Sequence, residues 1–597
     1  MSISEETARA HVNDPAVLCC RAEKGIKLTC HNLEDPAIFD DLVDSGLLDL
    51  TGCLKIGQVI GATLLETCDS LTPLTSDKID KIMEQSPTEE KEEAKAAVET
   101  KLPLPSGSGS IKISIGEGKD ILIEMPVSAS ANMGPAADNT PKPEKLIRSL
   151  KRKHYKITKV ERGPETKIEG TTLFIREGIE AEAVESQELV HDLKIEVITP
   201  DLYHTYSETI MDVQPIATKE KGSELGSGCT RVLDGVVMMV TGTDDNGVQI
   251  GEFGSSEGYL DENIMWGRPG APDKGEIFIK TQVTIKAGTN MERPGPLAAH
   301  SATDIITNEI RQALKNLDDE SLVVSTEEFN QYRRPGKKKV VIVKEIMGQG
   351  AMHDNLLIPI EPVGVLGAKP NVDLGNVPVV VSPLEILDGC IHALTCIGPA
   401  SKEMSRHYWR EPLVLEALFD PELDLCGVIL VGSPQINSEK FYVSKRVGMT
   451  CEALDVDGAF VTTEGFGNNH IDFASHIEQI GMRGISVVGL SFCAKQGALV
   501  VGNKYMTSMV DNNKSEAGIE NEILANNTLC PEDAIRAIAM LKTEMSGGSV
   551  ETAERKWSPD VKANNLKLIS NVTGKPIVPV ENETSLPMSK KRLEKYS

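Results

Sequence analysis

KKKVVIVKEIMGQGA, at Lys337–Ala351, is the first of several apolar runs that recur through the last part of the sequence. Helix-like stretches separate it from the later runs, which are CGVILVGSP (Cys426–Pro434), GAFVTTEGFGN (Gly458–Asn468), GISVVGLSF (Gly484–Phe492) and GALVVG (Gly497–Gly502). Strands that are buried on both faces of a parallel sheet are typically continuous apolar runs. The sequence therefore predicts a C-terminal parallel α/β domain, Rossmann-like, over residues 337–573. Pro531 predicts the start of one of its helices.

The preceding part of the chain has shorter strand-like segments. GTTLFI, DLKIEVITP, CTRVLDGVVMMVTG and GEIFIKTQVTIKA are separated by glycine clusters, and the pattern turns helical near Thr303–Leu317. Short alternating or apolar segments bounded by turn residues indicate strands. We therefore expect a central β-rich domain over residues 146–336.

Residues 1–127 are expected to form a small mixed region. Gly46–Thr67 has strand-like runs broken by glycines, and Gly109–Val127 alternates around two glycines in the manner of a β-hairpin. Residues 128–145 are small, polar and proline-rich, which predicts a linker. Residues 574–597 are expected to be a loose tail. The predicted fold class is thus α/β plus β-rich.

Composition excludes several classes of protein. The 597 residues suggest two to four domains. A formal charge of −27 and 4% aromatic residues argue against nucleic-acid binding. The sequence has no uncharged apolar run long enough to predict a membrane span, and its first residues do not resemble a secretory signal. We therefore expect a cytoplasmic location. The twelve cysteines form no paired CxxC motifs, so no metal site is expected.

The familiar nucleotide-binding motifs are absent from the sequence. It has neither GxxxxGK[ST] nor a GxGxxG that follows a strand, so no cofactor-binding residues are predicted. EGFGN follows an apolar strand, and ligands of open α/β sheets collect at that end of a strand. A plain glycine turn explains EGFGN equally well. Candidates for polar contacts to a substrate are Glu464, Asn468, His392 and His407, and a purely structural role stays open for each. His470 and His476 also fall in this half of the chain.

One segment combines chemistry-bearing residues at high density: DGCIHALTCIGPASKEMSRHYWREP, at Asp388–Pro412. Its centre, Thr395-Cys396, joins a strand-like run to a helix-like one. Composition alone favours a small buried thiol at Cys396.

Several blocks resemble the D-proline reductase family and, more distantly, the substrate-binding component of glycine reductase. They include SGCTRVLDGVVMMVTG, GQGAMHDNLLIP, LDGCIHALTCIGPASKEMSRHYWREPLVLEAL and DGAFVTTEGFGN, together with the N-terminal NDPAVLCCRAEKG. Members of this family cut their chain before a cysteine, which becomes a pyruvoyl group. By motif, the resemblance implies cleavage at Thr395-Cys396, with Cys396 as the residue that becomes the pyruvoyl cofactor.

The resemblance also implies a reaction and a partner. A ketone binds amines covalently, and D-proline would be held as an iminium and opened reductively to 5-aminopentanoate. The chain has no flavin or nicotinamide motif, so the electrons would come from a selenocysteine-containing reductase subunit. Residues 1–395 and 396–597 are expected to remain associated after cleavage.

Three alternatives stay open from the sequence. The chain is a reductase of the glycine or betaine type, or of another amine; or it is an unprocessed scaffold paralogue of the same complex; or it is a pyruvoyl-dependent decarboxylase. The proline-like N-terminal region disfavours the first alternative, and the Thr395-Cys396 junction disfavours the second. Decarboxylases of this kind usually mature at serine, which disfavours the third.

Overall fold

The structure is a computed structural model of the chain. It describes residues 5–19, 24–36, 50–66, 72–80, 109–115, 119–125, 143–250, 257–289, 294–346, 376–393, 404–434, 437–463, 469–492, 501–512, 523–525 and 528–548, with short pieces at 39, 43, 68, 356–357, 372–373, 550, 567 and 571.

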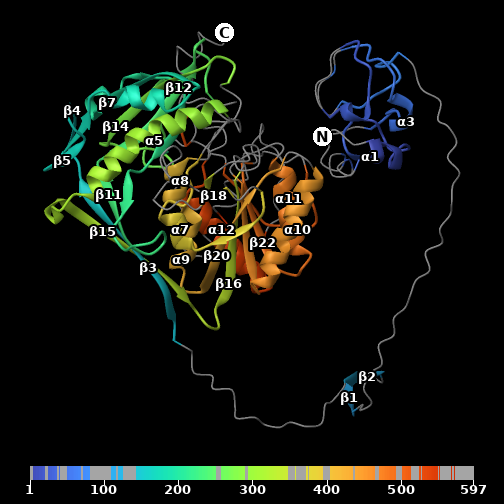
Figure 1. The fold of residues 1–597 in the computed structure, drawn as a ribbon. Helices are drawn as coiled ribbons and strands as arrows, with labels where there is room; N and C mark the ends of the chain where they lie inside the picture. Colours follow the sequence, from blue (N-terminus) through green and yellow to red (C-terminus); the bar gives the residue numbers. More distant parts are fainter. Residues whose placement is uncertain are drawn as a thin grey trace.

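A six-stranded sheet forms the centre of the C-terminal part (Figure 1). Its strands, in spatial order, are β19 (Val379–Val381), β20 (Leu423–Gly432), β16 (Lys338–Ile346), β21 (Gly458–Thr463), β22 (Ser486–Ser491) and β23 (Met509–Asp511). All neighbouring pairs are parallel except β19 and β20. The parallel pairing predicted from the apolar runs is confirmed. The run at 497–502 lies mostly outside the described residues, and the sixth strand forms later, at β23.

Helices cover both faces of this sheet: α7 (Pro383–Leu387), α9 (Pro412–Phe419) and α12 (Pro531–Met545) on one face, and α10 (Asn437–Ala453) and α11 (Asn469–Gly481) on the other. In β16, Val340 and Ile342 pack into the first core, whereas Val341 and Val343 pack into the second. Because side chains alternate along a strand, burial on both faces makes the whole strand apolar. The helix predicted from Pro531 is confirmed as α12.

The order of the parallel strands changes direction between β16 and β21. The chain runs from β16 to β20 on one side, and β21, β22 and β23 then follow on the other side. Ligands of open α/β sheets bind at such a point, outside the carboxyl ends of the strands. The segments after β16 and β21, residues 347–355 and 464–468, lie outside the described residues. The α/β class is confirmed, while the Rossmann-like domain remains a prediction.

Strands also dominate residues 145–333. One sheet has the order β10 (Ala217–Lys219), β11 (Gly228–Asp234), β3 (Lys145–Lys156), β15 (Val323–Arg333), and a second has the order β7 (Val190–Ile198), β14 (Ile277–Ile285), β12 (Val236–Asp244), β9 (Ile210–Gln214). Smaller sheets join β4 (Lys159–Gly163), β6 (Thr172–Arg176) and β5 (Lys167–Glu169), and β8 (Tyr206–Ser207) and β13 (Gly258–Tyr259). This part also contains helix α4 (Ile179–Glu185) and the 3-10 turns η3 (Pro200–Leu202) and η4 (Glu320–Leu322). Outside it, β17 (Leu356–Leu357) pairs with β18 (Val372–Asp373).

The longest helix, α5 (Pro294–Lys315), packs against these sheets (Figure 1). The sequence predicted its start nine residues too late, near Thr303, where the amphipathic repeat becomes clear. The missed residues, 294–302, begin with Pro294 and Pro296, and proline is compatible with the first turn of a helix. These additional residues, about two and a half turns, matter because they include His300, which is fully buried.

The N-terminal region differs from its prediction. Gly46–Thr67 was expected to contain strands, but it holds the helical turn α3 (Ile56–Val59) and isolated bridges. The other elements are α1 (Glu5–Ala10) and η1 (Cys30–Asn32), around a small core that includes Leu18 and Leu64. The predicted hairpin is confirmed as β1 (Gly109–Ile115) and β2 (Lys119–Met125). The domain boundaries remain predictions. Among the described helices, none has the length and apolar character needed to cross a bilayer.

Candidate processing and active site

The predicted cleavage junction, Thr395-Cys396, lies outside the described residues, as do Glu464 and Asn468. The described chain stops at Ala393 and resumes at Met404. The side chains around these two ends define the surroundings of the junction.

The two ends of the junction segment are joined by a hydrogen bond. The backbone N–H of Ala393 donates to Oγ of Ser405 over 2.9 Å, and both residues are buried. Ser405 is the first residue of helix α8 (Ser405–Trp409). An extended residue spans at most about 3.6 Å, so Cys396 lies within about 11 Å of Ala393. The segment that contains the predicted junction therefore begins and ends at residues that this hydrogen bond joins.

Asp212 fixes the same serine from strand β9. Its Oδ1 accepts from the Ser405 N–H at 2.8 Å, and its Oδ2 accepts from the Ser405 hydroxyl at 2.7 Å. Asp212 is completely buried, and this burial raises the pKa of its carboxyl to about 7. The hydrogen bonds from Ser405 act in the opposite direction, since they stabilise the carboxylate. A continuous chain of hydrogen bonds thus runs from β9 through Ser405 to Ala393.

Two buried histidines complete the cluster. Gln214 Nε2 lies 2.9 Å from His392 Nε2 and 2.9 Å from Asp212 Oδ2. Nε2 of His300 lies 3.9 Å from Asp212 Oδ2, and Nδ1 of His392 lies 3.6 Å from Asp304 Oδ2. Burial lowers the pKa of His300 to about 4 and the pKa of His392 well below its ordinary value. Both imidazoles are therefore neutral near pH 7.

Upstream of the junction, Asp388 anchors the chain to the β-rich part. Its Oδ2 accepts from Lys219 Nζ at 2.6 Å and from the Gly226 N–H at 2.7 Å, and its Oδ1 accepts from Thr230 Oγ1 at 2.6 Å. Lys219 and Asp388 are both buried. Burial raises the pKa of Asp388, whereas Lys219 favours its charged form. This ion pair holds the residues that lead to the junction.

Downstream of the junction, arginines anchor α8 to the same part. Arg406 donates to both oxygens of Glu276, at 2.6 and 2.7 Å, and Arg410 donates to both oxygens of Asp273, at 3.1 and 2.7 Å. Paired contacts of this kind fix orientation as well as charge. The segment singled out in the sequence, Asp388–Pro412, is therefore held on both sides of Thr395-Cys396.

The four histidines of this half have different surroundings. His392 belongs to the Asp212 cluster, whereas His407 packs against Gly270 and Tyr408. His470 contacts Ser491 Oγ at 2.8 Å, and Nε2 of His476 lies 3.9 Å from Glu345. Burial lowers the pKa of both His470 and His476 to about 3. The structure thus brings one predicted contact residue, His392, beside the junction.

A second cluster of buried polar side chains lies at the carboxyl ends of the strands of the six-stranded sheet. Glu345, near the end of β16, accepts from Asn469 Nδ2 at 3.1 Å. Lys440 pairs with Asp472, which also accepts from the Ser433 hydroxyl at 2.6 Å. Ser433 directly follows β20. These residues border the point at which the strand order changes direction.

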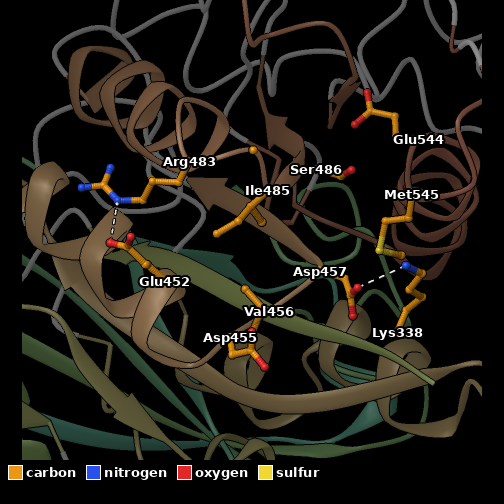
Figure 2. A pocket seen from close by; sticks show the side chains of 11 residues that line it. Lys338, Glu452, Asp455, Val456, Asp457, Arg483, Ile485, Ser486, Glu544 and Met545 are labelled. Carbon is orange, nitrogen blue, oxygen red and sulfur yellow. Dashed lines mark hydrogen bonds and ion pairs between the residues drawn. The ribbon is translucent and has the colours of Figure 1, made fainter. Parts of the chain in front are cut away.

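A cavity of about 450 Å³ lies at the amino ends of the parallel strands, opposite the carboxyl ends that Glu345 and Ser433 mark (Figure 2). Its walls carry two ion pairs, Lys338 with Asp457 at 3.1 Å and Arg483 with Glu452 at 3.4 Å. Lys338 begins β16, so the cavity is at the far end of that strand from Glu345. We therefore do not place the substrate there.

Replacing Ser405 by alanine is expected to lower the free energy of unfolding by about 1–3 kcal/mol. The change removes the acceptor of the buried Ala393 N–H and one donor to Asp212. Urea denaturation of the full chain measures the loss. Ser321→Ala is the matched control, because Ser321 also donates to an aspartate, Asp319, but in an exposed turn. A change of less than about 0.5 kcal/mol is expected for this control; equal losses in both variants would contradict the assignment.

Comparisons with known proteins show the family of the chain. Residues 292–565 match the family of glycine/sarcosine/betaine reductase component B subunits. Over its full length the chain is 65% identical to the D-proline reductase proprotein PrdA of Acetoanaerobium sticklandii, and the alignment covers 99% of that protein. The chain belongs to the D-proline reductase proprotein family.

More distant relatives of this D-proline reductase family member are components of other amine reductases. The glycine reductase complex component B subunits alpha and beta of A. sticklandii are 23% identical over 57% of this chain and 79% of that protein. The sarcosine reductase complex component B subunit alpha of Peptoclostridium acidaminophilum is 30% identical over 28% of this chain and 38% of that protein. No solved structure matches the chain.

Sequence reasoning missed most of the residues that surround the junction in this D-proline reductase family member. Asp212, His300 and Lys219 lie far from Cys396 in sequence and belong to no spaced motif. A signal exists for Asp212, because a carboxylate flanked by Met211 and Val213 in the strand IMDVQ must have buried partners. Ser405 lies inside the segment that was singled out, but nothing in the sequence distinguishes it from its neighbours.

Proposed function

We propose that this chain is the proenzyme of a D-proline reductase. It cleaves itself between Thr395 and Cys396, and Cys396 becomes a pyruvoyl group at the start of the second piece. The mature enzyme opens the ring of D-proline reductively to give 5-aminopentanoate. The support is the full-length identity of 65% to a protein named D-proline reductase proprotein, a name that indicates processing.

One observation carries the placement of the chemistry: the hydrogen-bond chain from Asp212 through Ser405 to Ala393. A peptide bond resists rearrangement unless its surroundings hold it in a reactive geometry. Here the described residues on both sides of the junction segment are buried and held in place, by Ser405 on one side and by Asp388 on the other. Asp212, Asp388 and Ser405 are buried. Burial suits a reactive carbonyl group, which must be kept from bulk water.

Maturation begins with attack of the Cys396 thiol on the carbonyl carbon of Thr395. The amide becomes a thioester, and the amine of Cys396 is freed. β-Elimination then removes the Cα proton of Cys396 and breaks its Cβ–S bond, so the sulfur leaves with Thr395 as a thiocarboxylate and the second piece begins with dehydroalanine. Dehydroalanine tautomerises to an imine, and hydrolysis of this imine by water releases ammonia and leaves the ketone. Asp388 holds the backbone before the Thr395-Cys396 bond, and Asp212, through Ser405, holds the backbone after it. We assign both aspartates a positioning role.

The pyruvoyl carbonyl supplies an electrophile that takes up the amine of proline. The electrons come from a separate selenocysteine-containing subunit, in keeping with the multicomponent complexes named for the glycine and sarcosine relatives. Residues 1–395 and 396–597 stay together after cleavage. The proposed location is the cytoplasm, where thiols remain reduced; none of the nine described cysteines forms a disulfide with another described residue.

The intact mass of the purified protein tests the proposal. We expect two masses, for residues 1–395 and for residues 396–597 with a converted Cys396. A hydrazine reagent should add to the second piece alone. In the presence of the selenoprotein partner and a dithiol, D-proline should be consumed, while glycine and betaine should not.

Each alternative gives a different result. A single mass of the whole chain, with no hydrazine adduct, would reject self-cleavage and favour an unprocessed scaffold. Two masses with turnover of glycine or betaine instead of D-proline would keep the maturation and reject the substrate.

A further inference from the structure

We infer that Asp212, His300 and His392 form a binding site for one divalent transition-metal ion. Two imidazoles and one carboxylate are a ligand set that suits zinc or ferrous iron. The three residues come from β9, from α5 and from the segment before the junction. The inference does not depend on cleavage or on the identity of the substrate.

The ligand atoms are close enough to share one ion. One atom from each side chain lies within 4.8 Å of the others, and Asp212 Oδ2 and His300 Nε2 are 3.9 Å apart. Ligands at about 2.0–2.2 Å from a common metal ion are about 3–4 Å from one another, so the Asp212–His300 pair already has this spacing and the third ligand reaches it by a shift of about 1 Å. All three residues are buried, so the ion would be shielded from water.

A hydrogen bond orients His300, and a nearby carboxylate faces the outer nitrogen of His392. Nδ1 of His300 lies 2.9 Å from the carbonyl oxygen of Pro296, so this nitrogen carries the proton and Nε2 carries the lone pair. That Nε2 is buried and has no hydrogen-bond partner among the described residues. On the other histidine, Nδ1 faces the Asp304 carboxylate at 3.6 Å. Histidines that bind metals typically donate their other N–H to a carbonyl or a carboxylate.

Gln214 determines whether the site is open. Its Nε2 lies 2.9 Å from both His392 Nε2 and Asp212 Oδ2, while its Oε1 has no hydrogen-bond partner among the described residues. Rotation of the amide exchanges the two atoms. In the metal-free protein the amide N–H groups satisfy His392 and Asp212. When a metal ion binds, the Gln214 amide rotates and presents Oε1 as a fourth metal ligand.

The charges near the cluster favour a cation on balance. Asp212 is a ligand and Asp304 lies behind His392, so two carboxylates face the site. Arg311 on α5 opposes them, because its charge acts on His392. The exposed group His204, Asp261 and Glu262 has similar residue types. There the imidazole stacks on Tyr259 at 4.2 Å and solvent competes for the carboxylates, so that group serves as the control.

The full-length Cys396→Ala protein tests the site, because it cannot mature and lacks the nearby thiol. When this protein is purified without a nickel column and without chelators, it should contain about one equivalent of zinc or iron. Inductively coupled plasma mass spectrometry measures this metal content. After chelator treatment, cobalt(II) should restore one equivalent and give visible absorption bands of a nitrogen- and oxygen-bound ion. His300→Gln should weaken cobalt binding at least about 100-fold, and His204→Gln should leave it unchanged.

Two results would overturn the inference. One is a folded full-length protein with less than about a tenth of an equivalent of any transition metal and no cobalt bands. The other is unchanged cobalt affinity in a folded His300→Gln or His392→Gln variant. Circular dichroism shows whether the variants are folded. If they are not, the metal content of the Cys396→Ala protein alone tests the inference. Cleavage is measured separately on the wild type, so failure of one proposal leaves the other standing.

Discussion

Replacing Cys396 by alanine should leave one unbroken polypeptide of 597 residues and lower D-proline turnover by more than about a thousandfold. Alanine has no atom that can attack the carbonyl of Thr395, so neither the thioester nor the ketone forms. The loss is large because the whole covalent route depends on this side chain. Intact mass, a hydrazine adduct and turnover with the partner subunit measure the three consequences.

Two companion variants separate chemistry from folding. Cys396→Ser keeps a nucleophile and should cleave slowly, since an ester can form in place of the thioester. Cys426→Ala is the control, because this half-buried thiol lies on β20, with its sulfur 3.5 Å from the Asp424 carbonyl, and has no place in the mechanism. Complete cleavage in the Cys396→Ala protein would show that the chain is cut elsewhere, and the assignment of the junction would fail.

Replacing Lys219 by methionine should lower the free energy of unfolding by about 3–5 kcal/mol. The methionine fits the space but leaves Asp388 buried without its cation, with only Thr230 and Gly226 as donors. A buried charge without its partner is among the most costly single changes in a protein. Cleavage should also slow, because Asp388 holds the chain that leads to Thr395. Urea denaturation and the time course of cleavage measure the two effects.

The controls use a second lysine and a double variant. Lys338→Met removes a pair with Asp457 that is largely exposed, so a loss below about 1 kcal/mol is expected. Lys219→Met combined with Asp388→Asn removes both charges and should recover part of the stability. If Lys219→Met costs no more than Lys338→Met, the buried pair does not anchor the junction segment.

The parallel sheet was predictable because its strands have buried faces on both sides. Val340–Val343 have no polar residue to mark a solvent face, and this uninterrupted run is the signature of such a strand. The N-terminal region was mispredicted for the opposite reason. Ile56 and Val59 favour strands by residue type, but their spacing of three also fits one helical turn, and four residues are too few to decide between the periods.

The surroundings of the junction could not be predicted from local sequence. His300 and His392 meet only because α5 packs beside the segment before Thr395, and a long-range contact of this kind leaves no spacing pattern. The junction itself was recognised by resemblance, since Cys396 alone reads as an ordinary buried thiol. Asp388 and Ser405 lie in the segment Asp388–Pro412, but their roles depend on partners in the β-rich part.

The position of β16 sets the order of events in making the enzyme. This strand precedes the junction, but it pairs with β20 on one side and β21 on the other, and both of these follow it. A polypeptide that began at residue 396 would lack both β16, in the middle of the sheet, and β19, and would leave β20 unpaired on both sides and β21 unpaired on one side. We therefore expect the uncut chain to assemble the sheet before the proposed cleavage at Thr395-Cys396. Residues 1–395 and 396–597, made as two separate chains, are expected to aggregate through such exposed strand edges.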